Sequence, residues 1–358
     1  MGERSGLDRA KIGRRGLWAG WRNLCAAVPL SLCLGEAYAA ALPELSAGQQ
    51  QLLLSTGEEK PYNVRLHFLK SNERRHDLFF SVLSRLGGGY LGVGADQNYT
   101  LAAVANAELV FLVDIDGEVI RWHKIYAALI PVAPSPQDLL KLLQARADAQ
   151  AKEALEQRWP TEAAELLQSY RNYRHMLGIH LQNEMQVRHN GRPSTWISDP
   201  VLYARIRALM IARRVIARVG DLHGERTMLS IGDAAHALHV TIRTVYLSNV
   251  EQWFQYSPQF RRNLVHLPHD GRTIVLRTLA RGDVPAPPED RWHFSVQSLD
   301  EFIARIDSPV RKLRRVQDLV PDMARATRPG VRGLSWLGGL PNPPPRPWSE
   351  LPPLRNTP

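Results

Sequence analysis

Two short apolar runs near residue 100 predict neighbouring strands of a buried sheet. Tyr90–Val93 ends in a Gly-x-Gly turn, and Leu109–Val113 ends in the acidic segment Asp114–Asp116. Between the two runs, Thr100–Ala105 is predicted to be a helix. Continuous apolar strands joined by a helix are typical of a parallel sheet, because helices then cover both of its faces. The pattern therefore predicts the first half of a doubly wound α/β fold.

Apolar residues at helical spacing recur on both sides of this start. They predict helices over 71–86, 119–129 and 298–306. Tyr62–Leu69 alternates in part, which predicts a strand or an extended approach. Residues 40–60 have the pattern of a short helix followed by a linker.

A long helical and charged stretch follows the second strand. It begins at Ser135, where a helix N-cap is followed by proline in the first turn, and it continues to about Val187. Asp199-Pro200 begins one more helix, whose apolar positions run to Val215. We interpret residues 135–218 as a helical insertion between the second and third strands.

The sheet is predicted to resume after this insertion. Met228–Ile231 has the pattern of a short strand, and 233–239 that of a short helix. Two further strands are predicted at Thr244–Leu247 and Arg272–Arg277. Residues 40–320 are therefore predicted to form one mostly parallel, Rossmann-like domain with its insertion. The Pro- and Arg-rich residues 321–358 are predicted to be a disordered tail.

The first 39 residues have the layout of an export signal. Basic residues precede the apolar segment 24–34, and Ala37-Tyr38-Ala39 fits a cleavage site. The apolar segment is too short to cross a bilayer, so we expect no transmembrane span in the mature chain. The sequence thus predicts a periplasmic or cell-envelope protein. The alternative is a cytoplasmic protein with a disordered leader or a wrongly assigned start codon.

Composition restricts the chemistry further. Cys25 and Cys33 both lie within this leader, so a cleaved chain has no disulfide, no thiolate catalysis and no cysteine-bound zinc. The formal net charge is +10, but the basic residues concentrate at the two ends of the chain. No basic and aromatic run forms a nucleic-acid module, so the sequence argues against nucleic-acid binding.

Polar residues collect where the predicted parallel strands end. Ligands of such folds bind beyond the carboxyl ends of the strands, where strand order reverses. There a glycine turn lets the backbone approach a ligand, and a carboxylate on the next strand can accept hydrogen bonds from ribose hydroxyls. The candidate binding residues are Gly92, Gly94, Asp96, Asn98, Asp114, Asp116, Asn249 and Glu251.

Several of these candidates also have a purely structural interpretation. Asp96 and Asn98 can cap the helix that follows them, and Asp116-Gly117 can be a turn. Asn249 can cap a short helix. The sequence leaves these alternatives open for each residue taken alone.

Other polar motifs point less clearly to chemistry. His223 lies between two carboxylates and is a candidate general base, although the sequence favours a solvated loop with a helix cap. The pairs His236/His239 and His266/His269 have no accompanying carboxylate motif, so no metal site is predicted. The chain has neither a Gly-x-Ser-x-Gly elbow nor a Gly-Lys-Ser/Thr phosphate loop, which argues against a serine hydrolase or a P-loop enzyme.

Taken together, these motifs resemble class I S-adenosylmethionine-dependent methyltransferases. Gly92-Val93-Gly94 stands at the family's glycine-rich loop, Asp114 or Asp116 at its ribose-binding acid, and Ser248–Glu251 at the tip of its fourth strand. The wider pattern of Tyr90–Tyr99, Leu112–Asp116 and Tyr246–Asn249 resembles an uncharacterised bacterial family with that fold. The resemblance covers about residues 60–310.

The resemblance implies a methyltransferase-like fold and makes S-adenosylmethionine a candidate cofactor. The chain departs from the family because Ala95-Asp96 replaces the third glycine and the insertion is longer than one crossover helix. Export would also separate the protein from a cytoplasmic cofactor. We therefore expect a protein that binds a small ligand in the crevice, or a partner protein through the insertion or tail. The alternative is an S-adenosylmethionine-dependent methyltransferase.

Overall fold

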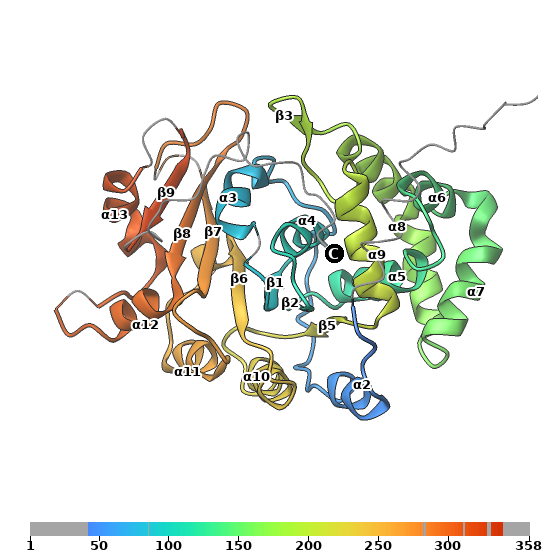
Figure 1. Cartoon of the computed structure of the whole chain (residues 1–358), viewed down its shortest axis with the longest axis horizontal. Coiled ribbons are helices and arrows are strands. Elements are labelled where there is room, and N and C mark those ends of the chain that lie inside the picture. Colours follow the sequence, from blue (N-terminus) through green and yellow to red (C-terminus); the bar gives the residue numbers. More distant parts are fainter. Residues whose placement is uncertain are drawn as a thin grey trace, which may run out of the picture.

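A twisted sheet forms the centre of the molecule (Figure 1). The computed structural model describes residues 42–84, 86–280, 282, 284–310, 312–327 and 331–338. Within these ranges, seven strands form one sheet. In spatial order they are β5 (Val215–Val219), β2 (Leu109–Asp114), β1 (Gly89–Val93), β6 (Ile242–Ser248), β7 (Ile274–Ala280), β8 (Trp292–Ser298) and β9 (Leu334–Leu337).

Five of these strands are parallel to their neighbours, from β5 at one edge to β7. Strand β8 runs antiparallel to β7, and β9 runs parallel to β8. The five parallel strands follow the order 3-2-1-4-5 of a doubly wound sheet, with the reversal between β1 and β6. The predicted fold class, a doubly wound and mostly parallel Rossmann-like α/β sheet, is confirmed.

The core lies on both faces of the sheet because successive side chains of a strand point to opposite sides. Tyr90 of β1 belongs to one apolar cluster, and Leu91 belongs to the other. Val110 and Phe111 of β2 divide in the same way. Since both faces are buried, the central strands carry apolar residues continuously, which is the pattern visible in the sequence.

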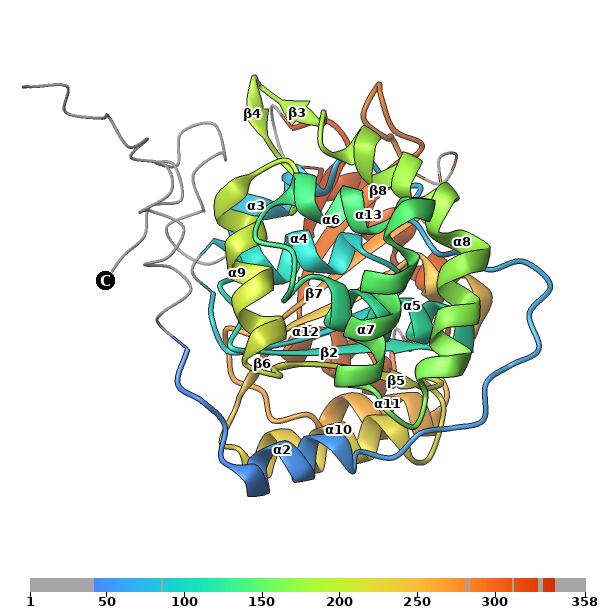
Figure 2. The ribbon, with the colours of Figure 1, turned by 90° about the vertical axis from the view of Figure 1, so that its right-hand side faces the viewer.

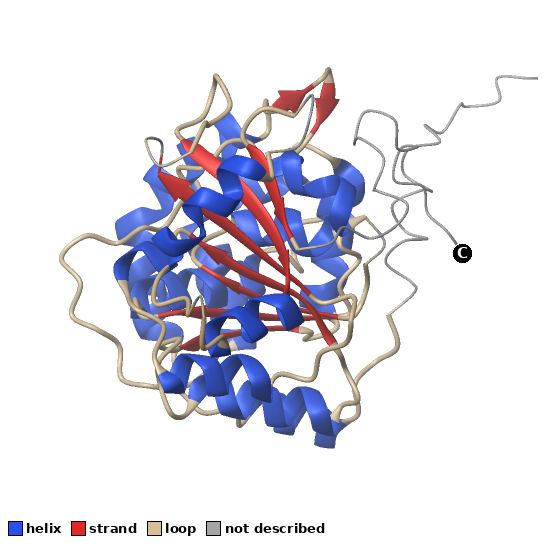
Figure 3. Ribbon diagram, turned by 90° about the vertical axis from the view of Figure 1, so that its left-hand side faces the viewer, coloured by secondary structure: helices blue, strands red, loops and turns tan. Residues whose placement is uncertain are grey.

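Helices cover each face (Figure 3). The face of Tyr90 packs against α3 (Phe80–Leu83), α4 (Gln97–Val104), α5 (Gly117–Leu129) and α9 (Pro200–Ile211). The face of Leu91 packs against α2 (Ala47–Leu54), α10 (Thr227–Ala237), α11 (Pro258–His266), α12 (Leu299–Asp307) and α13 (Val320–Arg325).

The predicted helical insertion is an additional lobe beside α5, at the front in Figure 2. It contains α6 (Pro136–Leu142), α7 (Asp148–Arg158) and α8 (Ala163–Glu184), and its buried residues join the same apolar cluster as α5. A small hairpin, β3 (Arg188–His189) and β4 (Arg192–Pro193), leads from α8 to α9. The sequence did not predict this hairpin, whose two-residue strands are too short to show a pattern.

An extended segment, residues 57–75, follows α2 and is called the strap below. It forms neither helix nor strand, although the sequence allowed a strand at Tyr62–Leu69. Its backbone N–H groups at Glu59 and Tyr62 donate to the carbonyls of Val219 and Ile115, at the ends of β5 and β2. In Figure 2 it runs from α2 along one side of the molecule. The strap therefore lies across the carboxyl ends of the strands.

The prediction for the third strand was wrong. Residues 228–231 belong to α10, because Met228, Ile231 and Ala235 are buried at helical spacing against the sheet. The third strand is instead β5, which the sequence had assigned to the end of a helix. That helix ends early because Arg213 adopts a left-handed conformation with φ 57°.

The two ends of the chain were predicted to be an export signal and a disordered tail. The structure places most of α13 and all of β9 in the segment from residue 321 onward, which the sequence had assigned to the tail. The predicted export signal 1–39, with both cysteines, and the Pro-rich residues 341–358 lie outside the described residues. Within the described part of the chain, no helix is long and apolar enough to cross a membrane.

Candidate functional site

Two adjoining cavities lie at the carboxyl edge of the parallel strands. The first has a volume of about 510 Å³ and includes Asp221 in its wall, and the second has a volume of about 310 Å³ and includes Gly94. We call them the Asp221 cavity and the Gly94 cavity. Their sizes fall within or at the edge of the range of ~300–1,000 Å³ typical of ligand pockets. They share the wall residues Val93, Asp114, Ile115, Val250 and Trp253.

Asp114 occupies the junction of the two cavities, at the end of β2. Its carboxylate accepts a hydrogen bond from the backbone N–H of Asp116 at 2.8 Å, and the nearby N–H groups of Gly94 and Ile115 also stabilise its charged form. Burial raises the pKa of Asp114 to about 6, although these N–H groups act in the opposite direction. Asp114 therefore connects the glycine loop to β2 and presents a carboxylate to both cavities.

Asp116 also lines the Gly94 cavity, but its oxygens are already in use. It caps α5 by accepting the Glu118 N–H at 2.9 Å. Its Oδ2 lies 2.9 Å from Nδ1 of His67 on the strap. Asp116 thus begins α5 and holds the strap against the strand ends.

The glycine loop turns at Gly94, whose φ of 88° favours glycine. A Cβ at this position would approach Nε2 of Gln97 to 2.9 Å. Gly92 is required for a different reason, since a Cβ there would overlap Asn98 Oδ1. Gly94 lines the second cavity, and Gly92 lines neither.

Gln97, the first residue of α4, was not predicted as a site residue. It lines the Gly94 cavity and is only 8% exposed. Its Oε1 is buried without a hydrogen-bond partner among the described residues. A buried polar atom of this kind is costly unless a partner is provided, which points to a ligand donor.

Asp96 and Asn98 lie beneath the loop, outside both cavities. Asp96 accepts from Nε2 of His180 at 3.0 Å and from the indole N–H of Trp196 at 3.2 Å. Burial alone would raise the pKa of Asp96, but His180 and Trp196 hold it below its usual range. Asn98 donates to the carbonyls of Val93 and Ala95 and accepts from the Tyr90 hydroxyl at 2.7 Å. Both residues fix the shape of the glycine loop.

Asn249 and Glu251 follow β6 and have different environments. Asn249 lines the Gly94 cavity, and its carboxamide forms no hydrogen bond with another described residue. Glu251 is 1% exposed and lines neither cavity; its Oε2 lies 2.6 Å from Nε of Arg277. Its Oε1 accepts from the Tyr256 hydroxyl at 2.8 Å. Of the eight predicted residues, Gly94, Asp114, Asp116 and Asn249 therefore meet at the cleft.

The loop after β5 provides the polar side of the Asp221 cavity. Asp221 accepts from the hydroxyl of Tyr62 at 2.6 Å and from the N–H of His223. His223 Nδ1 lies 2.8 Å from Ser257 Oγ, whereas its Nε2 is buried without a partner among the described residues. Burial lowers the pKa of His223, which favours the neutral ring. The sequence identified this histidine but placed its loop before the third strand, so its part in the cleft was not visible.

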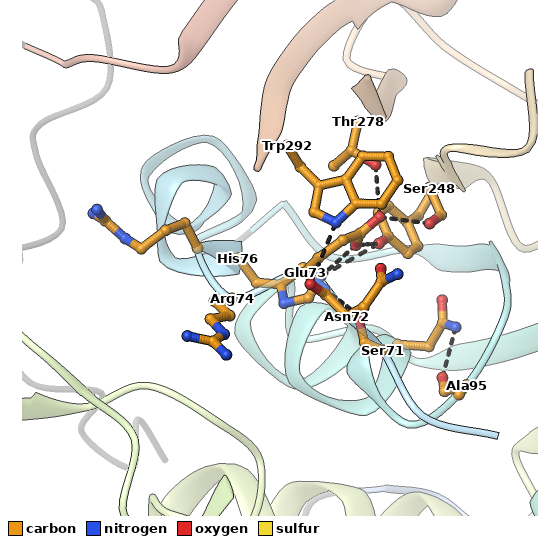
Figure 4. A network of polar contacts seen from close by, with 12 residues as sticks. Ser71, Asn72, Glu73, Arg74, His76, Ala95, Ser248, Thr278 and Trp292 are labelled. Carbon is orange, nitrogen blue, oxygen red and sulfur yellow. Dashed lines mark hydrogen bonds and ion pairs between the residues drawn. The ribbon is translucent and has the colours of Figure 1, made fainter. Parts of the chain in front are cut away.

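A buried network next to the Gly94 cavity was also missed (Figure 4). Its centre is Glu73 of the strap, which accepts from Ser248 Oγ and Thr278 Oγ1, each at 2.6 Å, and from the Tyr246 hydroxyl. Nε2 of His76 lies 2.8 Å from the same carboxylate. Burial would raise the pKa of Glu73, but these hydrogen bonds and the charge of His76 hold it below its usual range. The only sequence signal was the polar run 71–73, which had been interpreted as a helix start.

The two histidine pairs of the sequence lie outside both cavities. The rings of His236 and His266 lie 5.8 Å apart, and His266 Nε2 lies 2.7 Å from Asp233. Among the described residues, no group of three or more histidine, cysteine, aspartate or glutamate side chains is arranged to hold a metal ion.

The chain belongs to the family of the domain of unknown function DUF7790. The model of that family matches residues 68–338. No curated protein matches the chain. Among solved structures, the chain is similar to the rRNA methyltransferase aviRa from Streptomyces viridochromogenes, with 13% identity and a TM-score of 0.29; the match covers 69% of this chain and 86% of that one.

The first prediction follows from the buried ion pair between Glu251 and Arg277. Glu251→Gln leaves the Arg277 guanidinium, which is 0% exposed, without its counter-charge. We expect the free energy of unfolding to fall by about 3 kcal/mol, as measured by urea denaturation. The control Glu156→Gln removes the exposed pair with Lys152 and is expected to stay within about 1 kcal/mol of wild type. Equal stability of the two variants would contradict the prediction.

The second prediction concerns the pH dependence of stability. Because the pKa of Asp114 is about 6 in the folded protein and about 4 when unfolded, the folded state holds a proton that the unfolded chain has lost between these values. Wild type should therefore lose stability relative to Asp114→Asn as pH rises from 4 to 7, by up to about 3 kcal/mol. Urea denaturation at each pH measures the difference, and a difference independent of pH would refute the prediction.

Proposed function

We propose that the cleft binds S-adenosylmethionine and that the protein is an S-adenosylmethionine-dependent methyltransferase. One observation carries the proposal. His223 and Gln97 line opposite cavities, each has a buried polar atom without a partner in the described chain (Nε2 and Oε1), and Asp114 lies at the junction. Such an arrangement suits an elongated ligand with polar groups at both ends and hydroxyls in the middle.

The Asp221 cavity has the chemistry of a site for a planar heterocycle. Val113, Leu222 and Phe254 supply apolar wall, and Asp221 and His223 supply polar groups. Adenine offers two flat apolar faces, an amino donor and ring-nitrogen acceptors. The cavity can therefore pack against its faces and form hydrogen bonds with its edge.

The junction and the Gly94 cavity fit the rest of the molecule. The Asp114 carboxylate can accept ribose hydroxyls, as an acid at this position does in dinucleotide-binding sheets. At Gly94 the backbone can come close to a ligand, and the N-terminus of α4 favours a carboxylate. Gln97 Oε1 can accept a hydrogen bond from an ammonium group. The residues present thus fit both charged groups of the amino-acid end.

When bound, the cofactor supplies an electrophilic methyl group. The protein then has to orient a nucleophile and exclude water, which requires little acid–base machinery. Asn72 and Asn249 line the Gly94 cavity and can form hydrogen bonds with an acceptor molecule. Trp253 lines both cavities and is 83% exposed, so it is placed to cover a bound ligand.

Calorimetry with S-adenosylhomocysteine on the full chain tests the proposal. We expect saturable binding, weakened about 10- to 100-fold in Asp114→Asn because a charged hydrogen-bond acceptor is lost. The control Asp233→Asn changes a carboxylate that lines neither cavity and should bind as wild type does. The absence of heat at millimolar ligand with wild-type protein would rule the proposal out.

A second candidate is ligand or partner binding without chemistry, in the cell envelope. The apolar rim of the Gly94 cavity favours it, since Leu66 and Phe68 of the strap are 67% and 66% exposed. The predicted export signal agrees with this function. Cell fractionation with N-terminal sequencing tests it, because a mature periplasmic protein beginning at Ala40 that does not bind S-adenosylhomocysteine would favour it over methyl transfer.

A further inference from the structure

We propose that buried Glu73 is a positioning residue that holds the strap and the tip of β6 together as one acceptor subsite for a nitrogen nucleophile with N–H groups. The subsite consists of Asn72, Ser248 and Asn249 at the Gly94 cavity. This inference rests on the proposed function and adds the residue that assembles the acceptor side.

Glu73 joins three segments that are distant in the sequence. It lies on the strap, and its Oε1 accepts from Ser248 Oγ at the end of β6 and from Thr278 Oγ1 on β7. Figure 4 shows these residues converging on one carboxylate beside Asn72. The glutamate side chain is 2% exposed and lines neither cavity, so it is not placed to contact a ligand directly. It acts through the residues that it holds.

The tip of β6 requires such support. Ser248 has a φ of 49°, a conformation that non-glycine residues seldom adopt. The pairing of β6 with β7 also shifts register between Tyr246 and Ser248. A strained residue of this kind persists only when neighbouring groups hold it. The hydrogen bond from Ser248 to Glu73 stabilises this conformation and thereby fixes the position of Asn249.

The strap side of the subsite depends on the same carboxylate. Asn72 directly precedes Glu73, and its backbone carbonyl accepts from the Trp292 indole at 3.3 Å. The carboxamides of Asn72 and Asn249 form no hydrogen bonds with other described residues, and both residues line the cavity. Their two carboxamide oxygens can accept hydrogen bonds from N–H groups. For this reason we assign a methyl acceptor that reacts through a nitrogen atom.

Glu73 is suited to positioning rather than to proton transfer. Its hydrogen bonds and the neighbouring His76 hold the pKa of Glu73 below its usual range, although burial opposes this. Contact with Glu73 likewise raises the pKa of His76 against the effect of burial. Each partner therefore favours the charged form of the other, and a carboxylate with a lowered pKa is a weak base.

The test compares two ligands of the full-length protein by calorimetry. S-adenosylhomocysteine has no group at the transfer position, whereas sinefungin has an amino group there that can donate to the subsite. Wild type is expected to bind sinefungin about tenfold more tightly. In Glu73→Gln this preference should fall to about one, with the affinity for S-adenosylhomocysteine changed less than threefold. If Glu73 only maintained the fold, Glu73→Gln would lower the affinity for both ligands by the same factor.

Asp290→Asn is the matched control. As whole residues, Asp290 and Glu73 are each 7% exposed, and Asp290 holds the same segment through the N–H groups of Arg74 and Arg75 without touching β6. It should keep the wild-type preference. If Glu73→Gln does not fold, as judged by circular dichroism, Ser248→Gly removes the hydroxyl while relieving the φ strain and should also lose the preference.

The outcomes separate the two proposals. If wild type binds neither ligand, the proposed function fails and this inference fails with it. If S-adenosylhomocysteine binds but Glu73→Gln or Ser248→Gly keeps the wild-type preference for sinefungin, the inference alone is overturned. Loss of preference in Asp290→Asn as well would also overturn it, because any loosening of the strap would then be sufficient.

Discussion

Parallel pairing of β5, β2, β1, β6 and β7 brings the carboxyl ends of these strands to one edge of the sheet. The loops after β1, β2, β5 and β6 leave from this edge, and each contributes residues to the wall of a cavity. Because the strand order reverses between β1 and β6, the loops diverge there and leave the space of the two cavities. The cleft is thus a consequence of topology, and its chemistry depends on which side chains remain unpaired within it.

Buried carboxylates hold this edge in shape. Asp96 connects the glycine loop to His180 of the insertion, and Glu251 connects the loop after β6 to Arg277 of β7. Glu73 connects the strap to Ser248. A charge removed from water is tolerated only with partners, so each of these groups constrains two segments at once. Their partners also explain why Asp96 and Glu251 are unavailable to a ligand, although they belong to the predicted cluster.

Local patterns were reliable where burial is uniform. The apolar runs of β1 and β2 identified a parallel sheet, and Asp114 followed from its place at a strand end. The pattern failed at Val215–Val219. This short strand follows closely after a helix, so its apolar residues were interpreted as a continuation of the apolar face of that helix. The pattern also failed at Met228–Ile231, which was predicted to be a strand but belongs to a helix. A run of four apolar and small residues is compatible with either structure. Short apolar runs do not distinguish the two structures by themselves.

The sequence by itself determined the fold class, the glycine turn and the strand end at which a ligand would be held. These depend on hydrophobic periodicity and on the conformational freedom of glycine, which are local properties. Only the tertiary structure decided which polar residues face the cleft. Asp96 and Asn98 are one residue away from Gln97, yet only Gln97 lines a cavity, and Glu73 meets Ser248 across 175 residues of chain. Such choices depend on partners from distant segments, which no local pattern encodes.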